Sequence, residues 1–122
     1  MAKTGSIDIQ MKELLDEVSQ EVREAGAKSI KKISKESVSK LRNTSPKKTG
    51  DYAAGWTAKK ISDMVIVVHN KTDYQLTHLL ENGHVIKNKK GTYGRTRPIK
   101  HIAPVEEWAE SALPDEIMRE LK

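Results

Sequence analysis

The chain of 122 residues lacks both cysteine and phenylalanine, and only 4% of its residues are aromatic. The absence of cysteine excludes disulfides, thiolate zinc sites and thiol nucleophiles. The longest apolar run, MVIVV at residues 64–68, is far too short to span a membrane. The first ten residues, MAKTGSIDIQ, lack the apolar stretch of a secretory signal. We therefore expect one domain over residues 1–122, assembled in the cytoplasm and without a membrane partner.

Charge is distributed unevenly along the chain. Residues 25–105 hold 17 basic and 5 acidic side chains, whereas residues 1–24 hold 3 basic and 6 acidic ones. Residues 106–122 are acidic again, with 2 basic and 6 acidic side chains. A basic middle between acidic ends indicates an electrostatic partner, either nucleic acid or an acidic protein surface. In one mode of oligomerisation, the acidic end of one subunit meets the basic middle of the next.

A long helical pattern occupies the N-terminal third. Apolar side chains recur every three or four residues over 8–43, and the Ser45-Pro46 step ends the pattern. An unbroken helix of this length would measure ~54 Å, against a diameter of roughly 35 Å for a compact domain. The helix would therefore overhang its own domain. Either a kink at Gly26 folds it back, or a second subunit covers its apolar stripe.

Two strands are expected next. Residues 52–61 place Tyr52, Trp56 and two alanines on one face at a period of two. Residues 64–70 are β-branched and continuous, which is typical of a central strand covered on both faces. Ser62-Asp63 would form the tight turn between them.

Two more helices follow. The segment 74–82 predicts a short helix with Asp73 as N-cap and Gly83 as terminator. The segment 103–113 predicts a C-terminal helix that Pro114 interrupts, with a last turn or two over 115–122. The residues expected in the core are Leu76, Leu79, Leu80, Trp56 and Val65–Val68, and Trp108 is expected in the core or at an interface.

The stretch HLLENGH, residues 78–84, brings two histidines and a carboxylate close in sequence. A zinc enzyme is one hypothesis, but the spacing differs from HExxH, in which the ligands share one helical face. His78 and Glu81 are expected on an exposed flank, and His84 lies beyond the helix terminator. The sequence also has no nucleotide-binding glycine motif and no nucleophile elbow. We therefore predict no catalytic residue, no metal and no cofactor.

A basic loop is expected over residues 85–100, because no acidic side chain occurs between 82 and 105. VIKN and TRPIKHI could form two short strands joined by a flexible tip. The candidate contact residues are Lys87, Lys89, Lys90, Tyr93, Arg95, Arg97 and Lys100. A basic nucleic-acid-binding module is the alternative function, since phosphate contacts need lysine and arginine and an aromatic ring can stack on a base. The basic helix face around Lys28 to Lys35 is equally consistent with a solvated surface.

Three short segments occur in an order that is recognisable: SPKKTGDYAAGW (45–56), YQLTHLLENGH (74–84) and HIAPVEEW (101–108). Together they resemble the tail-component family of long-tailed bacteriophages and prophages, the tail-completion or head–tail joining proteins. The matching positions are Ser45, Pro46, Thr49 and Gly50, then Tyr74, Leu79, Leu80, Glu81, Gly83 and His84, then His101, Ile102, Pro104 and Glu107. Val105 departs from the usual alanine. The resemblance spans about residues 10–120.

This resemblance implies an α+β fold, with a long N-terminal helix on a small antiparallel sheet, a short middle helix and a C-terminal helix. It also implies a structural virion protein of the neck or tail, without catalysis or metal. Its partners would be copies of itself in a ring, commonly a hexamer, the head connector or stopper protein, and the tail-tube or tail-terminator protein. The basic loop would contact a neighbouring ring or face the DNA in the lumen.

Overall fold

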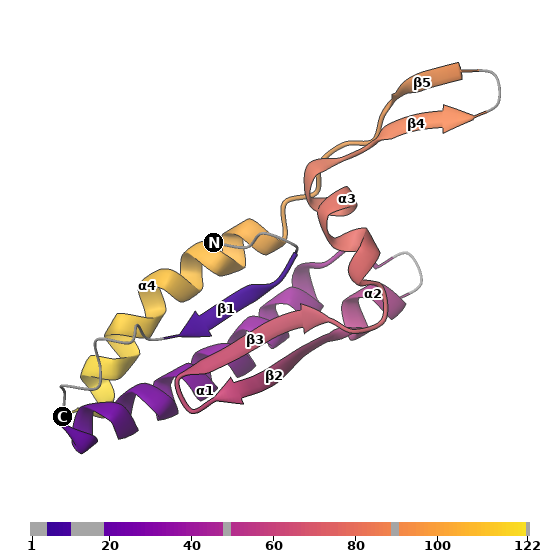
Figure 1. The fold of residues 1–122 in the computed structure, drawn as a ribbon. Helices are drawn as coiled ribbons and strands as arrows, with labels where there is room; N and C mark the ends of the chain where they lie inside the picture. Colours follow the sequence, from indigo (N-terminus) through magenta and orange to yellow (C-terminus); the bar gives the residue numbers. More distant parts are fainter. Residues whose placement is uncertain (1–4, 11–18, 48–49, 89–90, 122) are drawn as a thin grey trace.

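The computed structural model describes residues 5–10, 19–47, 50–88 and 91–121. The fold is α+β, as expected, with a long helix, a small antiparallel sheet, a short middle helix and a C-terminal helix (Figure 1). The elements in chain order are β1 Ile7–Gln10, α1 Gln20–Thr44, α2 Asp51–Ala54, β2 Trp56–Ser62, β3 Val65–Asn70, η2 Tyr74–Leu76, α3 Thr77–Asn82, β4 Val85–Asn88, β5 Gly91–Arg95 and α4 Ile102–Glu120.

The body of the molecule has two layers. One is the three-stranded sheet in the order β1-β3-β2, in which both neighbours pair antiparallel with β3. The other is formed by α1, which lies behind the sheet, and α4, which runs alongside β1 (Figure 1). Alternate residues of β1 and β3 face the helices and are buried, as the pairing of Ile7 with Val68 illustrates. This single buried face is enough to fix the strand register.

The two helices are joined by polar contacts as well as by the core. Lys32 of α1 forms an ion pair of 2.9 Å with the buried carboxylate of Glu116 on α4. The Lys40 ammonium lies 4.5 Å from the ring centroid of Trp108, a cation–π distance. The core between the layers includes Ile7, Ile9, Ile30, Ile33, Leu41, Trp56, Val68, Ile102 and Val105.

The N-terminal helix is shorter than predicted. Residues 8–10 belong to β1, residues 11–18 lie outside the described part, and α1 begins at Gln20 with the Ser19 hydroxyl accepting the Val22 N–H. The alternation of Ile7 and Ile9 with polar residues is a strand pattern, which the helical pattern downstream obscured. At 25 residues, α1 is about 38 Å long, which is close to the roughly 35 Å diameter of a compact domain and well below the ~54 Å expected for residues 8–43. It is unbroken at Gly26.

The first predicted strand is also corrected at its start. Residues 51–54 form the single turn α2, and the strand begins only at Trp56. Gly50, with φ of 88°, sets the direction of entry into this turn. β3 is central, as expected, but its second face is only half-buried. The turn between the strands is formed by Asp63 and Met64, one residue later than predicted.

The helices that follow differ from the prediction in the start of the short helix, in the burial of its leucines and at Pro114. The short helix opens with the 3₁₀ turn η2, and Leu76 is exposed, whereas Leu79 and Leu80 are half-buried. Pro104 lies in the first turn of α4, where the N–H would be free anyway. Pro114 does not interrupt the helix, because α4 continues through it to Glu120. Packing of α4 against α1 outweighs the lost hydrogen bond.

The expected basic loop is an antiparallel hairpin. β4 pairs with β5, so GTYGR rather than TRPIKHI provides the second strand. The hairpin extends away from the body (Figure 1), and we call residues 85–100 the arm. None of the helices in the described ranges is both long and apolar enough to cross a membrane.

Candidate functional site

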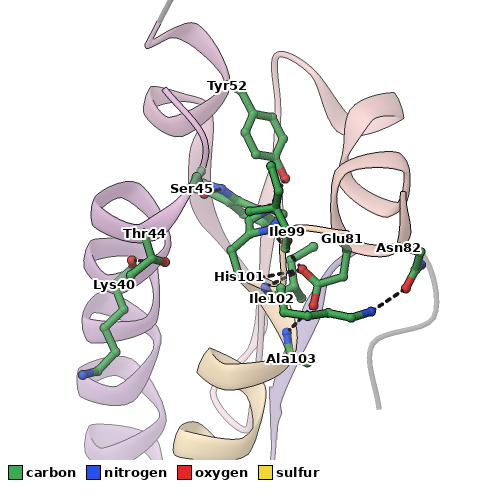
Figure 2. Close-up of polar contacts among 12 residues, drawn as sticks. Lys40, Thr44, Ser45, Tyr52, Glu81, Asn82, Ile99, His101, Ile102 and Ala103 are labelled. Carbon is green, nitrogen blue, oxygen red and sulfur yellow. Dashed lines mark hydrogen bonds and ion pairs between the residues drawn. The ribbon is translucent and has the colours of Figure 1, made fainter. Parts of the chain in front are cut away.

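The arm is attached to the body by Glu81, the last but one residue of α3. Its carboxylate accepts backbone N–H groups from His101 and Ile102 on Oε1, both at 2.8 Å, and from Ala103 on Oε2 at 2.9 Å. These three groups are at the N-terminus of α4, where backbone donors are left unpaired and the helix dipole is positive. Glu81 therefore caps α4 from another element, and Figure 2 shows its side chain directed at that helix end.

The imidazole of His101 continues this network. Its Nδ1 lies 2.9 Å from Glu81 Oε1 and 2.7 Å from the Ile99 carbonyl oxygen. Both are acceptors, so we assign the proton to Nδ1. Nε2 lies 2.7 Å from the Tyr52 hydroxyl, which donates to it when the ring is neutral. His101 is 1% exposed, so the pair links α2 to α4 inside the core.

An aromatic cluster surrounds this contact. The rings of Tyr52, Trp56 and His101 meet edge to face, with centroids 5.5 to 6.4 Å apart. The indole N–H of Trp56 donates to Ser45 Oγ at 2.8 Å. The Trp56 side chain is fully buried, and this hydrogen bond satisfies its single polar atom, the indole nitrogen. The Asn70 amide donates to the Tyr52 carbonyl at 2.7 Å. The ends of α1, α2, β3 and α4 are thus held together.

The two ends of the arm are tied beside Glu81. The outgoing end starts at Gly83, with φ of 74°, where an added Cβ would lie 2.5 Å from the Thr96 carbonyl oxygen. The Thr96 N–H donates to the His84 carbonyl at 2.8 Å. The returning end is held by Ile99, whose N–H donates to the Leu80 carbonyl at 2.8 Å. We call Glu81, His101 and these backbone ties the clamp.

The clamp shifts the pKa of Glu81 and of the neighbouring Tyr52. Burial opposes ionisation of Glu81, but hydrogen bonds from the N–H groups of Ile102, Ala103 and His101 outweigh it and lower the pKa of the carboxyl. Burial raises the pKa of the Tyr52 phenol, and the nearby Glu81 charge raises it further. Tyr52 therefore remains protonated and keeps its hydrogen-bond donor.

The polar side chains of HLLENGH do not converge on one point in the structure. Glu81, predicted to be exposed, is buried and bound to α4. His78 is exposed, and His84 Nδ1 lies 3.1 Å from Thr96 Oγ1, so the three side chains face different surroundings. Within the described ranges, no group of three or more His, Asp or Glu side chains could hold a metal ion.

The residues of the three sequence segments are partly brought together. Ser45, Glu81, Gly83 and His101 lie in or beside the clamp. The backbone groups of Leu80, His84 and Ile102 also take part in the hydrogen bonds of the clamp. Of the others, Pro46 is half-buried, Tyr74, Pro104 and Glu107 are exposed, Val105 is buried, and Thr49 lies outside the described residues.

The predicted contact residues all belong to the arm or its return to the body. Lys87 is in β4 and Tyr93 in β5, Arg95 ends β5, and Lys89 and Lys90 lie outside the described residues. Arg95, Arg97 and Lys100 are exposed. The Lys100 ammonium is 2.9 Å from the Asn82 side-chain oxygen.

Sequence reasoning missed the polar roles of Tyr52 and Asn70. The sequence predicts Tyr52 on the face of a strand and Asn70 only as the last residue of a strand. The signal available for Tyr52 was its place within the segment 45–56, and that for Asn70 was its place shortly before the segment 74–84.

The described residues thus form a small α+β body with an arm held at the start of its last helix. The family described as "Bacteriophage HK97-gp10, putative tail-component" matches residues 9–83. The chain therefore belongs to the HK97-gp10-like family of phage tail components, which confirms the resemblance and makes it a structural protein of the virion. Neither the curated proteins nor the solved structures gave a match.

Proposed function

We propose that this chain is a tail-completion or head–tail joining subunit, which forms a ring between the head connector and the tail tube. Membership of a tail-component family supports this role. Six subunits are expected from the family resemblance. The partners would be the connector or stopper protein on one side, and the tail-tube or tail-terminator protein on the other.

The observation that carries the proposal is the basic arm. It extends from the body, it holds no acidic side chain, and Arg95, Arg97 and Lys100 on it are exposed. A projecting two-stranded hairpin buries little surface within its own subunit, and such hairpins have marginal stability in water by themselves. A second surface would stabilise it. We assign that surface to a neighbouring ring or to the DNA in the lumen.

The test is size-exclusion chromatography with light scattering, on the chain alone and with the connector or tail-tube protein. The expected result is a closed oligomer in at least one mixture. A strict monomer in every mixture would contradict the ring. A variant with Arg95 and Arg97 changed to Glu should lose the heterologous complex, whereas Lys59→Glu with Lys71→Glu, both exposed lysines of the body, should retain it.

A nucleic-acid-binding module is the second candidate, favoured by the same run of charge on the arm. It predicts binding to DNA that weakens steeply with salt. Binding should fall when Lys87, Lys89, Lys90, Arg95 and Arg97 become Glu, and the dependence on salt should become shallower. Absence of binding near ~50 mM salt would exclude this candidate, because the electrostatic contribution is strong under that condition.

A further inference from the structure

A basic groove lies between α1 and the edge strand β2. Its volume is about 390 Å³. Its lining is Ala27, Ala58, Ile66 and Ser34, the lysines Lys28, Lys31, Lys35 and Lys60, and one acidic residue, Asp63. Lys60 forms an ion pair of 2.9 Å with Asp63. The three lysines of α1 are exposed, and within the described part of the chain they have no hydrogen-bond or ion-pair partner. Three positive charges beside an apolar floor are therefore available to a partner.

An acidic groove lies between β1 and α4. Its volume is about 220 Å³, and it is lined by Ile9, Ala109, Leu113, Asp8, Glu106 and Glu110, among others. Asp8 and Glu110 are exposed, and neither has an ion-pair partner among the described residues. This groove thus combines an apolar floor with charge of the opposite sign.

The two grooves are at opposite edges of the body. The sheet order is β1-β3-β2, so β1 and β2 are its two edge strands. Figure 1 shows α4 along the β1 edge and α1 behind the sheet. A surface on one edge that complements a different surface on the other edge is the requirement for a head-to-tail contact, which closes into a ring when the rotation is suitable.

We propose that the acidic groove of one copy docks against the basic groove of the next, with Glu110 and Asp8 facing Lys31 and Lys35 of the neighbour. The apolar floors supply buried area, while the charges fix the register and the direction of assembly. This inference rests on the proposed ring, and it names the surfaces that form it. The occupant of each groove is a second copy of this chain.

Cross-linking tests the contact directly, because the chain has no native cysteine. The double variant Lys35→Cys/Glu110→Cys, treated with a short bis-maleimide, should give a ladder of covalent oligomers that ends at the ring. Either cysteine alone should give no ladder, since a head-to-tail contact does not bring position 35 near position 35. The matched control is Lys71→Cys/Glu110→Cys, which uses an exposed lysine outside the basic groove.

Charge reversal supplies a second, independent measurement. Lys31→Glu/Lys35→Glu and Asp8→Lys/Glu110→Lys should each weaken self-association by more than about tenfold, because like charges then face each other. An equimolar mixture of the two variants should assemble again, as alternating copies with every contact complementary. Circular dichroism and the urea midpoint of each variant show that it is folded.

The outcomes separate the two proposals. If the wild-type chain assembles while the ladder is absent and the reversals have no effect, the groove contact is wrong and the ring proposal stands. A dimer from either single cysteine would also overturn it, since that result shows a symmetric contact. A wild-type chain that remains monomeric alone and with both neck partners overturns the ring and the groove contact together.

Discussion

Replacing Glu81 by Gln tests the clamp most directly. The carboxylate accepts three N–H groups of α4 and lies 2.9 Å from His101 Nδ1. Gln keeps one acceptor oxygen but turns an N–H₂ group towards a donor, and it removes the charge. Hydrogen bonds to a charged group contribute about 1.5–3 kcal/mol each. We expect the free energy of unfolding to fall by about 2 kcal/mol for Glu81→Gln and by about 3–4 kcal/mol for Glu81→Ala.

The pH dependence has a defined sign. Because the pKa of Glu81 is lowered on folding, its contribution is fully present above the unfolded value, near ~4.3. It is lost as the pH falls through the lower folded value. Wild-type stability should therefore decline below about pH 4.5 more steeply than that of Glu81→Gln, which has no carboxyl to protonate.

The assay is urea unfolding monitored by tryptophan fluorescence, at neutral pH and at a series of acidic values. The matched control is Glu107→Gln, which changes an exposed glutamate of α4, the helix that Glu81 caps, and should stay within about 0.5 kcal/mol of wild type. Equal stabilities for the two Gln variants at neutral pH would refute the capping role. So would parallel acid profiles for wild type and Glu81→Gln.

Three further changes test other parts of the fold. Tyr52→Phe should lower the free energy of unfolding by about 1 kcal/mol. Because folding raises the pKa of Tyr52, the stability of the wild type in urea titrations should also fall above pH ~10. An equal decline in the variant would contradict this explanation. Gly83→Ala should lower the free energy of unfolding by more than about 2 kcal/mol and make the arm sensitive to limited proteolysis. Gly91→Ala, where an added Cβ meets open space, should lower it by about 1 kcal/mol. Equal effects of the two variants would refute the close approach of Gly83 to Thr96. Pro114→Ala should raise the melting temperature, since it restores an N–H donor within a continuous helix. A lower melting temperature would contradict this and would show that the pyrrolidine ring of Pro114 makes favourable packing contacts.

The fold class could be predicted because its main features are local. Gly83 ends a helix by its conformation, and Pro104 fits the first turn of one. β1 was not predicted, because only Ile7 and Ile9 show the alternation of a strand before a helical pattern begins. Two residues are a weaker signal than the many apolar positions of the helical pattern that follows. The continuity of α4 through Pro114 depends on packing against α1, which a local rule cannot include.

The clamp could not be predicted from spacing. Glu81 and its three N–H partners are at least 20 residues apart in the chain, and the bonds form only after α3 and α4 have been placed side by side. On a short helix, a glutamate at this position usually faces water, and its local sequence contained nothing against that reading. The family resemblance marked Glu81 and His101 as members of one pattern, but it did not state that they touch.

The arm also has a mechanical consequence. Its outgoing end leaves the body at Gly83, two residues after Glu81 in the sequence. Its returning end is hydrogen-bonded to Leu80 through Ile99 and to Glu81 through His101, so both ends are held beside Glu81. A force on the arm is therefore transmitted to the body, because no flexible linker separates the two. The load passes through the carboxylate of Glu81 into the first turn of α4, and α4 distributes it along its whole contact with α1. The arm and the C-terminal helix should consequently tilt as one lever.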